Sequence, residues 1–422
     1  MTRSRIIAVA LMAAAALTVT GCSATDTPSD GAVTITFWGS YGNGGNSTQQ
    51  DALNDVLIPA FEAEHPDIHV EYVDIPYDSL LQKLTTSAAG DELPDLVRAD
   101  LGWVPQFAEL GVLVPLSQEM EDFDELAEAT YPGVLATNFY EGEYYGLPLD
   151  TNTRVMVSNQ AALDAAGLSA PPATFDELRA LADAVKGTGA YAFAENKLQA
   201  WNIMPWIWSA GGDIADSDLT TSTGYLDSDE SVAGVQLLVD LYEEDAIPNL
   251  IVGNEGATAT SDGLPGGQYA TILDGPWMRG VWSGQYPDFD PVYSTIPAGD
   301  GGSVSVVGGE DIVLTQSSAN KDAAVEFIRF TQSELFQIEM VKTGQMTVIP
   351  AFAGQQNEIE PFYATFASQL ETAKNRLAIP DAAKVDAILQ EELVPAFEGT
   401  ISVKQALANA AAAIDPLLPG AK

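Results

Sequence analysis

The chain has 422 residues, of which 46% are apolar and 18% are charged, and its formal net charge at pH 7 is −43. This composition is that of a globular protein, and the length favours two domains over one. A strongly acidic surface repels phosphate backbones and anionic lipid headgroups, which argues against nucleic acid as a partner.

The first 22 residues have the order of an export signal. Arg3 and Arg5 precede an apolar run from Ile6 to Leu17, and small residues follow up to Cys22, the only cysteine. The ending VTGC resembles the lipobox of bacterial lipoproteins, whose cysteine is acylated, for example with palmitate, and becomes the first mature residue. We therefore expect a lipoprotein signal peptide over 1–21, lipidation at Cys22 and a flexible, polar tether over 22–31.

This reading predicts the location of the mature protein. No other apolar stretch approaches the ~18 residues that a membrane span needs, so the anchor would be the protein's only membrane contact. We expect the folded part to work outside the cell, held at the outer face of the cytoplasmic membrane.

The first half of the folded part alternates strand and helix patterns. Residues 33–38 predict a strand that runs into a turn rich in glycine and asparagine. A helix over 51–64, a strand over 68–73, a helix over 79–89 and a strand over 96–98 follow. This alternation indicates an open, mostly parallel α/β sheet.

A second unit of the same kind begins near residue 150. Residues 153–157 predict a strand, and Thr174 with Glu177 has the spacing of a capping box before a helix. A tryptophan-rich segment over 201–213, a helix over 232–243 and a strand over 269–273 come next. A glycine-rich segment over 299–311 leads into a short strand over 312–314, and the chain after Ala351 is almost entirely helical in pattern.

Seven segments, in order, carry a resemblance to a known family. The chain is similar to the extracellular solute-binding proteins of bacterial ABC importers, in the carbohydrate-binding group that includes maltose-binding protein. The segments are FWGSYGNGG, FEAEHPDIHVEYV, PDLVRADLGWVPQFAELGVLVPL, YYGLPLDTNTRVMVSNQAALDAAGL with PPATFDEL, the tryptophan cluster before SAGGD, GGQYATILDGPW, and GGEDIVL followed by KDAAVEFIRF.

The resemblance implies a fold of two α/β lobes with hinge strands and an interlobe cleft. Lobe one would comprise 32–149 plus 311–345, and lobe two 153–308 plus 350–422, with hinges near 150–153, 308–311 and 345–350. Ligand would bind between the lobes, at the carboxyl ends of the strands, and a hinge motion would close the lobes around it.

A sugar site needs flat aromatic surfaces for the C–H face of a pyranose and planar polar groups for its hydroxyls. Trp201 and Trp277 lie where the family places its stacking aromatics, and Asp100, Asn152 and Glu310 match cleft positions of the family. The ligand-binding residues that we expect are Tyr41, Asn43, Asp100, Asn152, Gln199, Trp201, Trp277 and Glu310. A second set of candidates comprises Asp150, Arg154, Trp208, Gly309 and Arg376.

Two structural alternatives stay open for these residues. Arg98 and Arg154 fit a ligand-binding role as well as they fit a solvated loop charge. Trp206 and Trp208 alternate within an apolar segment, which favours the core, although Trp208 is also a candidate for the site.

Enzymatic functions find less support in the sequence. The two histidines, His65 and His69, lie at a helix end and in a strand, which leaves no base for a catalytic triad and few ligands for a transition metal. We expect no cofactor, no metal and no catalysis. The sequence predicts a monomeric binding protein that delivers a mono- or oligosaccharide to the transmembrane subunits of an ABC permease. The alternatives are a binder of a polyol or another small polar solute, and a surface glycoside hydrolase.

Overall fold

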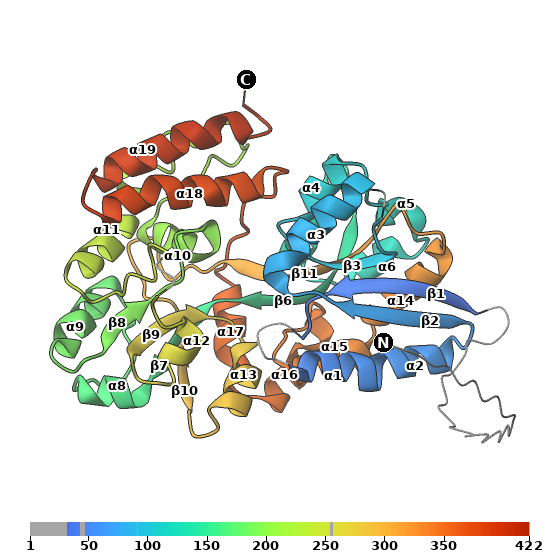
Figure 1. Cartoon of the computed structure of the whole chain (residues 1–422), viewed down its shortest axis with the longest axis horizontal. Coiled ribbons are helices and arrows are strands. Elements are labelled where there is room, and N and C mark those ends of the chain that lie inside the picture. The colour runs from blue at the N-terminus through green and yellow to red at the C-terminus, as the bar shows by residue number, and fades with distance from the viewer. Residues whose placement is uncertain (1–31, 43–46, 91, 254–255, 422) are drawn as a thin grey trace, which may run out of the picture.

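The computed structural model describes residues 32–42, 47–90, 92–253 and 256–421. Within these ranges the chain forms two lobes, each built around its own sheet (Figure 1). This arrangement confirms the α/β class and the two-lobed fold expected from the sequence. The signal peptide, Cys22, the tether and Asn43 lie outside the described residues.

The first lobe contains a five-stranded sheet in the order β2-β1-β3-β11-β6. Its strands are β1 (Val33–Gly39), β2 (Ile68–Asp74), β3 (Leu96–Asp100), β6 (Gly146–Thr153) and β11 (Val307–Leu314). β1 is parallel to β2 and β3, whereas β11 is antiparallel to both β3 and β6. A small hairpin of β4 (Phe139–Tyr140) and β5 (Glu143–Tyr144) lies apart from this sheet.

Helices cover both faces of the first sheet. The face that contains Ile35 and Phe37 packs on an aromatic cluster, in which the Phe327 ring lies 5.6 Å from Phe37 and 5.1 Å from Phe61. The helices of this lobe are α1 (Ser47–Ala52), a π-helical segment (Leu53–Leu57), α2 (Ile58–Glu64), α3 (Tyr77–Gly90), α4 (Val104–Glu109), α5 (Leu116–Glu119), α6 (Phe123–Glu128), α7 (Pro132–Leu135), α14 (Lys321–Thr331) and α15 (Glu334–Val341).

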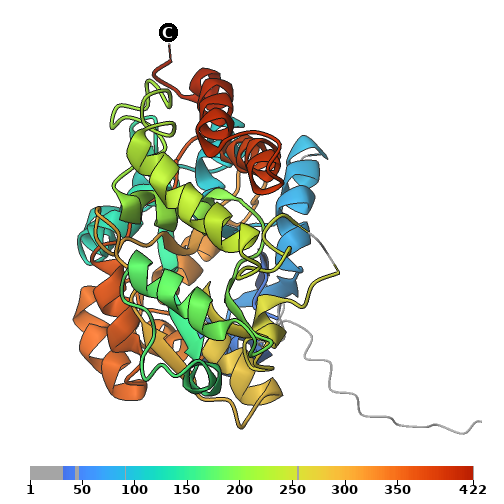
Figure 2. The same ribbon diagram turned by 90° about the vertical axis from the view of Figure 1, so that its left-hand side faces the viewer.

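The second lobe contains a four-stranded sheet in the order β10-β7-β9-β8. Its strands are β7 (Val155–Asn159), β8 (Tyr191–Ala194), β9 (Tyr269–Asp274) and β10 (Pro291–Ser294). Its helices are α8 (Gln160–Ala165), α9 (Phe175–Val185), α10 (Ala200–Ala210), α11 (Asp229–Glu243), α12 (Thr260–Gly263), α13 (Met278–Gln285), α16 (Ala353–Ile359), α17 (Tyr363–Leu370), α18 (Ala382–Phe397) and α19 (Val403–Ile414), although α16 also contacts α15 of the first lobe. Figure 2 views this lobe from its outer side, with the green and yellow-green helices toward the viewer.

Local signals fix several of these helices. The Thr174 hydroxyl accepts from the Glu177 amide at 3.2 Å and the Glu177 carboxylate accepts from Ala173, which confirms the expected helix start. The N-cap residue of α10, Gln199, supplies no side-chain cap; instead the Asp386 carboxylate, from α18, accepts from the Ala200 amide at 2.8 Å. Among the described residues, no helix combines the length and the apolarity needed to cross a bilayer.

The two sheets are joined by strands that lie side by side. β6 ends at Thr153 in the first sheet and β7 begins at Val155 in the second, so that only Arg154 separates them. β11 pairs along β6, and Met346 forms a bridge with Thr151 of β6. The expected hinges near 150–153, 308–311 and 345–350, and the lobe limits that follow from them, remain predictions.

Three details of the expected fold were wrong. The two large sheets are mixed, not mostly parallel, because the strands that join the lobes run antiparallel to their neighbours. The strand expected over 153–157 spans the end of β6 and the start of β7. The strand expected over 312–314 begins at Val307 and includes two glycines.

Candidate functional site

A buried cluster of charged groups lies where β3, β11 and β6 run side by side. The Arg98 guanidinium, on β3, lies 2.8 Å from Glu310 Oε2 and 3.4 Å from Asp150 Oδ2. It also donates to the Ser40 hydroxyl at 3.1 Å and lies 4.4 Å from the centre of the Tyr41 ring. Arg98 is therefore not a solvated loop charge: its side chain is 4% exposed.

One cation in this cluster faces two carboxyl groups. Glu310 and Asp150 occupy paired positions of β11 and β6. Burial raises the pKa of Glu310 well above its ordinary value, and the charge of Arg98 opposes this rise only in part. The neighbouring Asp311 is also buried, which raises its pKa to about 8. Burial therefore favours the neutral form of the Glu310 carboxyl group, whereas the charge of Arg98 favours its ionised form.

A second arginine organises the facing part of the second lobe. Arg154 donates to Glu195 at 3.0 Å, to the Asn202 side chain at 3.0 Å and to the Trp201 carbonyl at 3.2 Å. Its side chain is 4% exposed, so that Arg154 is not a solvated loop charge either. Burial raises the pKa of the nearby Asp274 to about 7. Arg154 thus holds the start of α10 against the sheet, and Trp201 with it.

Two of the expected aromatics form a pair. The Trp201 and Trp277 rings lie 6.4 Å apart with an angle of 33° between their planes, and both are partly exposed. The edge of Trp201 lies over Gly308 of β11, where a Cβ would approach the Trp201 ring to 2.5 Å and Asn152 Oδ1 to 2.2 Å. The ring can therefore contact this strand only because residue 308 has no side chain. The next residue, Gly309, has φ of +132°, a conformation that favours glycine.

A third arginine joins the two lobes. Arg376, in the segment between α17 and α18, donates to Asp100 Oδ1 at 2.7 Å. Tyr77 donates to Asp100 Oδ2 at 2.8 Å and the Gly102 amide donates to Oδ1 at 2.8 Å. Asp386 lies near Arg376, and burial raises its pKa. Asp100 was expected to bind ligand directly, but three protein donors already occupy its carboxylate.

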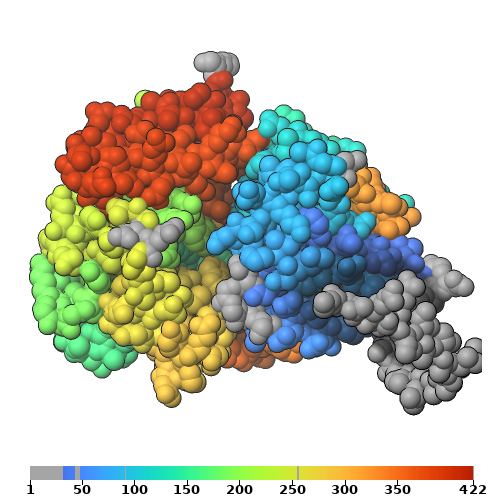
Figure 3. Space-filling view, in the orientation of Figure 1, coloured from blue at the N-terminus to red at the C-terminus, as the bar shows by residue number. Residues whose placement is uncertain are grey.

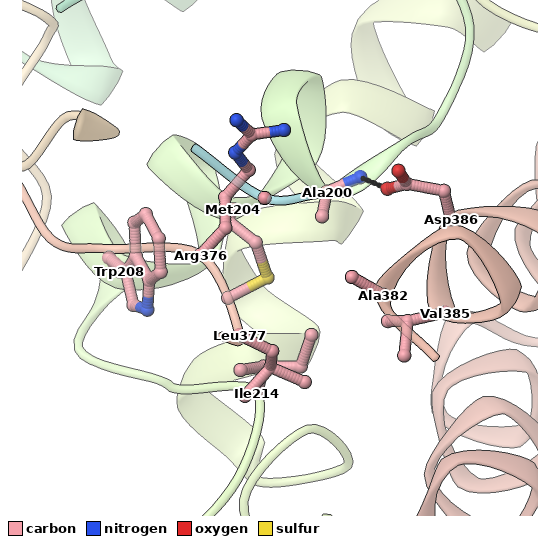
Figure 4. Close-up of a pocket in the computed structure, with 10 residues that line it drawn as sticks. Ala200, Met204, Trp208, Ile214, Arg376, Leu377, Ala382, Val385 and Asp386 are labelled. Atoms are coloured by element: carbon pink, nitrogen blue, oxygen red, sulfur yellow. Dashed lines mark hydrogen bonds between the residues drawn. The ribbon is translucent and has the colours of Figure 1, made fainter. Parts of the chain in front are cut away.

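The remaining expected residues lie in different surroundings. Gln199 is exposed just before α10. Trp208 is 2% exposed in the core of the second lobe and donates to Asp213 at 2.8 Å. It also lines a small pocket, of about 30 Å³, together with Met204, Arg376 and Asp386 (Figure 4). The pocket is too small for a pyranose ring.

Several buried polar atoms around these arginines have no hydrogen-bond partner among the described residues. They include Tyr41 Oη, Asn152 Oδ1 and Arg376 Nε, as well as the Nε atoms of Arg98 and Arg154. A buried polar group without a partner costs about 1–3 kcal/mol, and a ligand that supplied the missing hydrogen bonds would recover part of that cost. Figure 3 shows the two lobes meeting along a seam. The residues described above come from both lobes: Asp100 and Glu310 lie on β3 and β11, whereas Trp201 lies on α10 and Arg376 in the segment before α18.

The arrangement therefore brings together most of the expected residues: Tyr41, Asp100, Asp150, Asn152, Arg154, Trp201, Trp277, Gly309, Glu310 and Arg376. Sequence reasoning missed Tyr77, Glu195, Asp274 and Asp386, and did not select Arg98. Of these, Asp274 directly ends a strand, which is a signal that could have been used. In the part of the chain that the structure describes, no three His, Cys, Asp or Glu residues are grouped as they would be around a metal ion.

Comparisons with known proteins show the family and the fold. The family model described as "Bacterial extracellular solute-binding protein" matches residues 44–335. A lipoprotein of Streptomyces antibioticus, described as uncharacterized and in the oleD 5' region, is 31% identical over 329 residues, which are 74% of this chain and 70% of that protein. The maltotriose-binding protein of Pyrococcus abyssi is 27% identical over 305 residues, 69% of this chain and 62% of that protein. The crystal structure of the cyclic α-maltosyl-1,6-maltose binding protein from Arthrobacter globiformis matches with a TM-score of 0.76 and 25% identity, over 92% of this chain and 99% of that chain.

Proposed function

Because the chain belongs to the bacterial extracellular solute-binding protein family, we propose that it captures a mono- or oligosaccharide between its lobes for an ABC importer. The permease subunits of that importer would receive the sugar. The family consists of binding proteins, which favours this function over the glycoside hydrolase alternative. The maltotriose and cyclic maltosyl-maltose ligands named for two relatives support a carbohydrate over a polyol.

The observation that carries the proposal is the composition of the seam between the lobes. A partly exposed tryptophan pair, Trp201 and Trp277, offers an aromatic surface to the C–H face of a pyranose. Asn152 Oδ1 and Tyr41 Oη, without hydrogen-bond partners among the described residues, lie on the strand and turn of the opposite side. Glu310 adds a buried carboxyl group to the same region, 2.8 Å from the Arg98 guanidinium.

We further propose that the mature protein is anchored by lipid at Cys22. The VTGC sequence after an apolar export signal supports the anchor, and one relative is named as a lipoprotein. Two acyl chains would hold the protein stably at the membrane, where a single chain would not.

A thermal-shift screen against neutral mono- and oligosaccharides tests the sugar proposal. Ligand at 100 times its Kd stabilises the folded protein by about 2.7 kcal/mol, which is a readily measured rise in Tm. A panel of polyols and a chromogenic glycoside serve as comparisons. If only polyols raise Tm, or if the glycoside is hydrolysed, the proposal is wrong.

Tryptophan variants then test the site itself. We expect Trp201→Ala and Trp277→Ala to weaken sugar binding by about 1–3 kcal/mol in calorimetry, because each loses an aromatic contact with the sugar. The control is Trp206→Ala, since Trp206 is 0% exposed in the core of the second lobe. That control should lose about 3–5 kcal/mol of stability. Affinities equal to wild type in both Trp201 and Trp277 variants would remove the pair from the site.

A further inference from the structure

The Arg376–Asp100 ion pair joins the two lobes directly. Asp100 ends β3 in the first sheet. Arg376 belongs to the second lobe, because Lys374 pairs with Val306 and with Asp213, and Leu377 packs on the core formed by α9, α10 and α18. Of the 14 ion pairs among the described residues, this one alone connects the lobes.

Each half of the contact is fixed within its own lobe. On the first lobe, Tyr77 and the Gly102 amide hold the two oxygens of Asp100 at 2.8 Å each. On the second lobe, the Arg376 guanidinium lies 5.3 Å from the centre of the Trp201 ring. A contact between two groups that are already oriented loses little side-chain entropy when it forms, so that it can open and close as a unit.

The pair is also shielded from solvent. The side chains of Arg376 and Asp100 are 17% and 9% exposed. Burial alone would lower the pKa of Arg376, but the charge of Asp100 raises it overall. Next to the pair, the Asn375 side chain donates to the Gly133 carbonyl, at the start of the first lobe's α7, at 3.1 Å. Consecutive residues of one segment thus reach across to the first lobe.

We propose that Arg376 and Asp100 form a latch that draws the two lobes together without help from a ligand. Tyr77 positions the carboxylate, and Trp201 positions the guanidinium. The latch requires only the two-lobed fold, so it does not depend on the proposed sugar. It also gives Asp100 a positioning role in place of the direct ligand contact that the sequence suggested.

The test measures the distance between the lobes in sugar-free protein. Cysteines replace two exposed residues, Leu110 of the first lobe and Tyr225 of the second, which are 55% and 42% exposed, in a Cys22→Ser background. Spin labels on these cysteines report the interlobe distance distribution by double electron–electron resonance. We expect wild type to populate a short distance, and Arg376→Gln and Asp100→Asn to reduce that population by about five-fold.

Three further measurements make the result specific. Lys374→Gln removes a cation two residues away whose partner, Asp213, lies 2.9 Å away in the same lobe, and should leave the distribution unchanged. Arg376→Lys keeps the charge and should retain part of the short-distance population. The double variant Arg376→Gln with Asp100→Asn should open no further than either single variant, because one contact is lost in each case.

Two outcomes would overturn the latch. One is an interlobe distance distribution in Arg376→Gln that equals that of wild type. If Asp100→Asn fails to fold, the Arg376→Gln variant alone decides the test. The other is an equal shift in Lys374→Gln, which would reflect the charge of the segment in place of the ion pair.

Discussion

Replacing Arg98 with Met should destabilise the protein more than any exposed ion pair can. The Arg98 guanidinium lies 2.8 Å from Glu310 and 3.4 Å from Asp150, and the three side chains are 4%, 13% and 1% exposed. The variant leaves two carboxyl groups buried without their cation, and breaking such a cluster costs about 3–5 kcal/mol. That is a large part of the ~5–15 kcal/mol that stabilises a typical protein.

Arg329 provides a closely matched control for this experiment. It also faces two carboxylates, Asp122 at 2.7 Å and Glu326 at 2.6 Å, but its side chain is 32% exposed. Solvent screens this cluster, so Arg329→Met should cost only about 0–1 kcal/mol. Urea unfolding followed by tryptophan fluorescence measures both free energies of unfolding.

Two further measurements examine the cause of the loss. Adding Glu310→Gln to Arg98→Met removes one of the two stranded carboxyl groups and should restore part of the stability. The loss should also be smaller at about pH 5.5 than at about pH 8, because the stranded carboxyl groups can then take up protons. The reasoning fails if Arg98→Met loses no more stability than Arg329→Met at pH 8.

Three other predictions follow from single residues. Burial raises the pKa of Asp311 from 3.8 to about 8, so the stability that its protonated carboxyl group contributes is complete below pH 3.8 and is lost as pH rises through 8. In wild type this lowers the free energy of unfolding by about 1.4 kcal/mol per pH unit between about pH 5 and 7, and Asp311→Asn should remove that slope. Equal slopes in wild type and Asp311→Asn would contradict the prediction. Gly308→Ala should weaken sugar binding about ten-fold or more, because its Cβ would displace Asn152 and Trp201, whereas Gly354→Ala, which meets nothing within 4 Å, should bind as wild type does. Cys22→Ser should release the protein from the membrane fraction without changing its Tm, and a mature N-terminus without lipid in wild-type protein, measured by mass spectrometry, would disprove the anchor.

The sequence predicted the outer strands and the helices well because their patterns are periodic. β1 alternates between more and less buried residues along its length, and α9 begins at a side-chain cap. The joining strand β6 was missed because every residue of Gly146–Thr153 is buried, so the alternation of a half-exposed strand is absent. Its polar residues Asp150 and Asn152 were expected only as part of a hinge near 150–153.

The site was predictable in part, from the resemblance to a known family. Trp201, Trp277 and Asn152 were expected from resemblance, and the structure brings them to one seam. The structural role of Arg154 and the burial of Arg98 were not predictable, because their partners Glu195 and Glu310 lie 41 or more residues away in the chain. A local sequence pattern cannot predict which distant carboxylate will pair with a buried cation.

The order of the first sheet also determines when this lobe can fold. β11 lies between β3 and β6, so these two strands, although made early, are joined only through a strand that ends at Leu314. Because the chain is synthesised from its N-terminus, about three quarters of it must be made before this sheet can be completed. Such long-range strand pairing is slow. For the export proposed above, this delay would keep the first sheet incomplete until most of the chain has been made.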